Sequence, residues 1–124
     1  MAGSGRGYLE HAKSDASLKY YNWACFSAEQ SAEKAVKAVL QKMGAEAWGH
    51  SVADLLQGLS TKKAVPNALI NGALELDKAY IPSRYPDAHP SGSPRNRYTE
   101  DEAKRLIEHA EKIYKFCSDL LPGI

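Results

Sequence analysis

Apolar residues recur at three- and four-residue spacing along most of the chain, which predicts helices. The clearest pattern covers residues 23–43, a stretch without Gly or Pro that ends at Gly44, a residue suited to the left-handed conformation after a helix. One face of this predicted helix is apolar, with alanine in its first half: Ala24, Ala28, Ala32, Ala35, Val36, Val39, Leu40 and Met43. Small side chains there predict that another helix packs closely against this face.

Trp23 and Phe26 lie off this stripe among polar residues. They predict a second apolar surface on the same helix, which other parts of the protein or a second protomer must cover.

Four shorter patterns complete the predicted elements. After a frayed end at residues 1–5, helices are expected over residues 8–19, from a capping Ser51 to residue 56 or 59, over residues 66–80, and from a capping Thr99 to residue 121. The stripe of the 66–80 helix comprises Leu69, Ile70, Ala73, Leu74, Asp77 and Tyr80. Because no strand-like alternation occurs, the predicted class is all-α: an antiparallel up-and-down four-helix bundle with a short extra helix.

Residues 82–98 differ from the rest of the chain. Prolines occur at positions 82, 86, 90 and 94 among Ser, Gly, Arg and Tyr residues. Prolines at this density are incompatible with a helix interior, so we expect a long Pro-rich loop before the last helix. Loops longer than about 12 residues are usually functional or mobile, which makes this loop a candidate site.

Length, net charge and cysteine content limit the classes of protein to which the chain belongs. The chain has 124 residues, 44% apolar and 25% charged, which predicts a single domain over residues 1–124. A formal net charge of +1 gives no general attraction to nucleic acid or membrane, and no apolar run is long enough for a membrane span or signal peptide, so we expect a cytoplasmic protein. Cys25 and Cys117 lie among apolar helical positions and are interpreted as reduced core residues. No metal and no cofactor are expected.

Three runs of residues resemble the signature of HEPN domains, a family of small helical proteins. They are WACFSAEQSAEKAVKA from residue 23, WGHS from residue 48 followed by LL at residue 55, and YIPSRYPD from residue 80. The runs occur in the order found in the family and span most of the chain. The resemblance implies the helical bundle already predicted from periodicity.

Arg84 and His89 read R-x4-H, a spacing that resembles the R-x4-6-H motif of HEPN ribonucleases. An arginine binds a phosphodiester with two parallel donors, and an imidazole that titrates near neutral pH transfers the proton of a ribose 2′-hydroxyl. Such cleavage needs no metal and leaves a 2′,3′-cyclic phosphate. The resemblance also implies two protomers whose motifs line one cleft. However, Tyr85-Pro86 after Arg84 is similar to a HEPN branch in which the histidine is dispensable.

Three interpretations of this pair stay open: a structural Arg84 with a solvated His89, RNA cleavage, and phosphate or nucleotide binding without cleavage. Other candidates for binding substrate or phosphate have their own simpler interpretations. Tyr85, Arg95 and Arg97 form either a basic and aromatic patch or an ordinary solvated loop. Glu33 and Lys37, four residues apart, are either a surface ion pair or a substrate contact. His50 is either a turn residue near a helix start or part of the site.

The sequence and the resemblance lead to two alternative functions. In the first, the chain is a homodimeric module that binds nucleotide, RNA or a partner protein; it resembles HEPN partners of small nucleotidyltransferases in toxin–antitoxin pairs. In the second, it is a metal-independent endoribonuclease that uses Arg84 and His89. The identity of the substrate or partner does not follow from the sequence.

Overall fold

The structure is a computed structural model that describes the backbone of residues 2–84 and 98–123 and the side chains of residues 5–78 and 98–123. The helices are α1 (Ala2–Ser17), α2 (Tyr21–Lys42), α3 (Val52–Ser60), α4 (Asn67–Arg84) and α5 (Glu100–Leu120), and a 3-10 turn at Leu121–Gly123 follows. No strand occurs in these residues. The all-α prediction is therefore confirmed.

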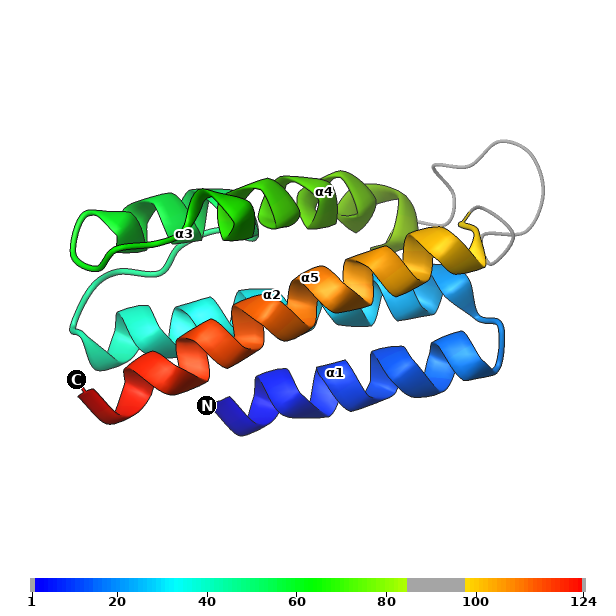
Figure 1. Cartoon of the computed structure of the whole chain (residues 1–124), viewed down its shortest axis with the longest axis horizontal. Coiled ribbons are helices and arrows are strands. Elements are labelled where there is room, and N and C mark those ends of the chain that lie inside the picture. The colour runs from blue at the N-terminus through cyan, green and yellow to red at the C-terminus, as the bar shows by residue number, and fades with distance from the viewer. Residues whose placement is uncertain (1, 85–97, 124) are drawn as a thin grey trace.

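The four long helices alternate in direction along the chain (Figure 1). Helices α1 and α4 run one way, and α2 and α5 run the other way, so both chain ends lie at the same end of the bundle. The short α3 lies beside α4 and runs opposite to it. Helix α2 packs against all four other helices, which makes it the centre of the molecule.

The alanine face of α2 is buried as predicted. Ala24, Ala28 and Ala32 are fully inaccessible to solvent, as are Val36 and Val39. Because these side chains are small, α1 packs closely against α2. A Cβ atom on Gly5 of α1 would lie only 3.0 Å from the carbonyl oxygen of Ser31, and the Ser31 hydroxyl donates a hydrogen bond of 2.6 Å to the Gly5 carbonyl.

This contact corrects the prediction for the N-terminus. Residues 1–5 were expected to be frayed and the first helix to begin near Tyr8, whereas α1 begins at Ala2. Glycine weakens a helix through its backbone entropy, which is why the local sequence argued against helix here. Packing against α2 offsets that cost, and the absence of a Cβ on Gly5 is what permits the packing.

Local rules correctly predicted the end of α2 and the start of α5. Gly44 has a φ of +77°, and the N–H groups of Gly44 and Ala45 donate to the carbonyls of Gln41 and Leu40, the paired bonds of a Schellman motif. Thr99 and Glu102 form the predicted capping box at the start of α5. After the end of α1, Lys19 adopts the left-handed backbone conformation, with a φ of +66°.

Helix α4 departs from its prediction at two places. Leu74 was assigned to the apolar stripe, but it is exposed, while Leu76 is fully buried. The buried line is Leu69, Ala73 and Leu76, spaced by four and three residues, because α4 packs against α2, α3 and α5 together. The helix also continues through Pro82 to Arg84. Proline removes one backbone donor, a loss that matters less near a helix end than in its interior.

The two cysteines are free and buried, as predicted. Burial raises the pKa of each thiol to about 12. None of the helices in the described ranges combines the length and the hydropathy that crossing a membrane requires.

The close packing of α2 gives a first prediction. Ala32→Leu adds three carbon atoms at a site without free space, and such overpacking costs about 1–3 kcal/mol of the free energy of unfolding. Thermal melting followed by circular dichroism should show a decrease of several degrees, whereas Lys34→Leu, on the partly exposed side of α2, should not. An unchanged melting temperature for Ala32→Leu would mean that this face of α2 is not tightly packed.

Candidate functional site

Three of the predicted site residues lie together on the side of α2 that faces the start of α3. Glu33 extends from the middle of α2, and its Oε2 atom lies 3.3 Å from Lys37 Nζ one turn further along the helix. Its Oε1 atom lies 3.1 Å from Nδ1 of His50, in the connection between α2 and α3. One carboxylate therefore holds a cation and an imidazole.

The burial of this carboxylate corrects one of the two simple interpretations. An ion pair on the helix surface was considered for Glu33 and Lys37, but the Glu33 side chain is only 1% exposed and that of Lys37 is 19% exposed. A buried carboxylate loses its hydration, and this loss must be offset by hydrogen bonds and an opposite charge. Lys37 and His50 supply both, so the predicted ion pair forms, but around a buried carboxylate and not on the helix surface, while His50 is exposed.

Further polar residues of α2 are buried, and sequence reasoning missed them. Glu29 is fully buried and accepts a hydrogen bond of 2.8 Å from the side-chain amide of its neighbour Gln30. Asn22 is 1% exposed, and neither of its amide atoms has a hydrogen-bond partner. Because α2 is surrounded by other helices, the spacing of its polar residues does not identify a solvent-exposed face.

The position of His50 is fixed by its neighbours at the start of α3. Ser51 caps α3 by accepting a hydrogen bond from the Asp54 N–H, as predicted. A second acceptor comes from α4: Asp77 accepts hydrogen bonds from the N–H groups of Val52 (2.8 Å) and Ala53 (3.1 Å) and from the Ser51 hydroxyl (2.8 Å). An acid on an otherwise apolar helix stripe was the sequence signal for this long-range role.

The remaining predicted site residues are not brought into this cluster by the described contacts. Arg84 is the last residue of α4, and its side chain lies outside the described residues. Tyr85, His89, Arg95 and Arg97 also lie outside the described residues. Their roles stay predictions. In the described part of the chain, no group of three or more His, Cys, Asp or Glu side chains is arranged to hold a metal ion.

A second carboxylate–imidazole pair joins α4 to α5. Glu75 Oε1 lies 2.8 Å from His109 Nε2, and Glu75 Oε2 lies 2.9 Å from Arg105 Nε. The hydrogen bond from His109, with that from Arg105, lowers the pKa of Glu75 below the usual range of a glutamate. The His109 side chain is half-buried because its ring packs against Gly72, where a Cβ atom would lie 2.8 Å from Nδ1.

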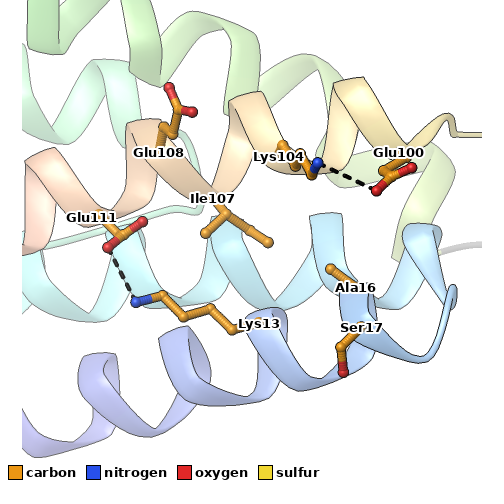
Figure 2. A pocket seen from close by; sticks show the side chains of 8 residues that line it. All are labelled: Lys13, Ala16, Ser17, Glu100, Lys104, Ile107, Glu108 and Glu111. Atoms are coloured by element: carbon orange, nitrogen blue, oxygen red, sulfur yellow. Dashed lines mark ion pairs between the residues drawn. The ribbon is translucent and has the colours of Figure 1, made fainter.

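A groove of about 390 Å³ lies between α1 and α5 (Figure 2). Its charged lining residues are engaged in ion pairs: Lys13 reaches from α1 to Glu111 of α5 at 3.1 Å, and Lys104 pairs with Glu100 at 3.3 Å. Ile107 lies between these pairs. This groove shares no residue with the Glu33 cluster, and its ion pairs lie at the surface instead of around a buried carboxylate, so it is the weaker candidate site.

The chain and its helical fold match one family of proteins. The family model of the HEPN domain matches residues 4–120. The chain belongs to the HEPN domain family. No functionally curated protein gives a significant match.

Solved structures support this assignment. The chain is 44% identical to the protein TT1696 from Thermus thermophilus, with a TM-score of 0.89 over 95% of this chain and 93% of that one. It is 56% identical to a HEPN domain protein from Thermotoga maritima, with a TM-score of 0.82 over 99% of this chain and 98% of that one. An archaeal HEPN homologue is 38% identical, with a TM-score of 0.79 over 95% and 92% of the two chains.

The Glu75 pair predicts a pH dependence of stability. A carboxylate whose pKa is lowered by folding stabilises the folded state above its unfolded pKa, and this contribution is lost as the pH falls through the folded pKa. Glu75→Gln should therefore lower the free energy of unfolding at pH 7 by about 0.5–1 kcal/mol, since the pair is partly exposed, and by almost nothing near pH 3. Urea unfolding at both pH values measures the difference. An equal loss at both would assign the effect to packing alone.

Proposed function

We propose that this HEPN protein is a homodimeric module that binds RNA or nucleotides, or a partner protein, in a toxin–antitoxin-like pair with a nucleotidyltransferase. The observation that carries the proposal is the Glu33 cluster. A carboxylate that is only 1% exposed is costly to retain unless partners within the protein offset its lost hydration. Here the carboxylate holds Lys37 and His50, two residue types that bind phosphate and ribose groups.

The end of α4 bears on the alternative function. The helix that carries Asp77, and so fixes the start of α3, ends at Arg84. Arg84 thus begins its R-x4-H sequence on a helix rather than in a loop. This observation favours a second candidate function, metal-independent RNA cleavage by Arg84 and His89.

The proposed dimer rests on the aromatic pair of α2. The Trp23 side chain is 50% exposed and makes an edge-to-face contact with Phe26, with ring centroids 6.4 Å apart. A self-complementary two-fold contact is the commonest way to cover such a surface.

Ligand binding is tested with fluorescence anisotropy of a labelled single-stranded RNA. Lys37→Ala and Arg84→Ala should each weaken binding and reduce its salt dependence, because each removes one proposed phosphate contact. Lys13→Ala is the matched control, since Lys13 is a lysine in the groove between α1 and α5. Equal affinities for wild type and all three variants would contradict the proposed location of the site.

The same samples, incubated with RNA in EDTA, distinguish the two candidate functions. If the protein cleaves RNA, the products should end in 2′,3′-cyclic phosphate, and His89→Ala should reduce the rate by roughly 10²–10⁴. RNA that is bound but stays intact would leave the binding module as the function.

The dimer is tested by light scattering. We expect a mass of twice 13.6 kDa at tens of micromolar protein, and Trp23→Lys should shift the mass toward the monomer by placing a charge in the interface. A wild-type monomer would contradict the proposed assembly without affecting the binding experiment.

A further inference from the structure

A small pocket lies where the end of α2 and the connection after it meet α3. The pocket has a volume of about 200 Å³, and two buried side chains, Leu40 and Leu55, are among its lining residues. Trp48 also lines it and is 79% exposed. Burying an indole removes a large apolar area from water. A ligand in this pocket therefore gains contact with a large aromatic ring that the protein itself leaves uncovered.

The charge of this pocket is negative. Its two charged lining residues are Glu46 and Asp54, and both are exposed. Glu46 accepts a hydrogen bond of 2.9 Å from the Trp48 indole N–H, which places one carboxylate at the edge of the ring. In the part of the chain that the structure describes, neither acid belongs to an ion pair, whereas Glu10 and Glu111 each have a basic partner. The pocket thus combines an aromatic ring with two carboxylates that no cation of these residues neutralises.

Gly58 leaves one side of the pocket open. It lies within α3 and lines the pocket, yet a Cβ atom at this position would meet no other part of the protein within 4 Å. Glycine destabilises a helix relative to alanine. Neither a left-handed backbone nor a close neighbour requires glycine here. A ligand that approaches α3 closely would give this glycine a function.

We propose that this pocket binds an arginine side chain of a partner protein. A guanidinium is planar, so it stacks on an indole while its N–H groups donate to carboxylates, a combination that fits Trp48, Glu46 and Asp54. An RNA phosphate does not fit, because two carboxylates repel it. The inference rests on the partner-protein part of the proposed function. It assigns partner binding and RNA binding to different surfaces, since the pocket shares no residue with the Glu33 cluster.

The inference is tested with a short capped peptide that carries a single arginine between glycines, titrated into the ¹⁵N-labelled protein. Two signals report on the pocket: the indole N–H of Trp48, assigned by its loss in Trp48→Leu, and the backbone N–H of Gly58, assigned by its loss in Gly58→Leu. We expect both signals to shift with the same affinity, which should fall as salt is added. The same peptide with citrulline, which has nearly the shape of arginine without its charge, should bind roughly tenfold more weakly. Unshifted pocket signals, or equal binding of the two peptides, overturn the inference.

Variants of the lining residues test each contact. Trp48→Leu, followed at Gly58, should weaken binding of the arginine peptide roughly two- to tenfold, the effect of one cation–π contact. Glu46→Gln and Asp54→Asn should each weaken it too, because each removes a charge and keeps the shape of the side chain. Gly58→Leu, followed at Trp48, should block binding by filling the open side while leucine favours the helix.

Glu108→Gln is the matched control, since it removes an exposed carboxylate from the groove between α1 and α5 and should leave peptide binding unchanged. Wild-type affinity in Trp48→Leu, or in the double variant of Glu46 and Asp54, overturns the inference. An equal loss of affinity in the control also overturns it, because binding would then reflect the overall charge of the protein.

Two further measurements separate this inference from RNA binding and from self-association. If the wild type binds RNA, Trp48→Leu should bind it equally well, and a loss of RNA affinity would place the pocket in the nucleic-acid site and overturn the inference. Trp48→Leu should also keep the wild-type mass in light scattering. A shift toward the monomer would identify a second copy of the chain as the occupant and likewise overturn it. Absence of RNA binding by the wild type contradicts the nucleic-acid function without affecting the arginine pocket.

Discussion

The structure depends on the enclosure of α2 by the other helices. Because α2 packs against four neighbours, many of its polar residues are buried, and each of these needs a partner inside the protein. The alanines let α1 pack closely, and the Gly5–Ser31 contact shows how little space remains between the two helices. The same enclosure buries Glu29 and Glu33, and it makes the pairing of Glu33 with Lys37 and His50 a requirement of the fold.

Burying the polar side chains of α2 costs free energy of folding, and only some of these side chains have partners that offset the cost. Glu33 is bound by an ammonium and an imidazole, whereas the buried amide of Asn22 has no hydrogen-bond partner. An unsatisfied buried polar group costs about 1–3 kcal/mol. Natural domains are only marginally stable, so a cost of this size is a large fraction of the total free energy of unfolding. They are concentrated on the helix that carries the candidate site, as expected where function rather than stability selects the residues.

Much of the fold was predictable because its signals are local. The alanine stripe, the left-handed Gly44 and the Thr99–Glu102 capping box each depend on residues within one or two helical turns. The failures are non-local. Asp77 caps a helix that begins 25 residues earlier; its position on an apolar stripe marks it as unusual, but no local pattern identifies its partner. The contact between Glu33 and His50 was likewise not predicted, although both residues were candidates, because a 17-residue separation hides their proximity.

The three hydrogen bonds of Asp77 have a mechanical consequence. They bind the middle of α4 to the first turn of α3, immediately after His50, so a displacement of α4 would act directly on the start of α3. A sliding motion of α4 along its axis would carry Ser51 with it and stretch the contact between His50 and Glu33, which is anchored on a different helix. The geometry of the imidazole is thus tied to the axial position of the helix that ends at Arg84.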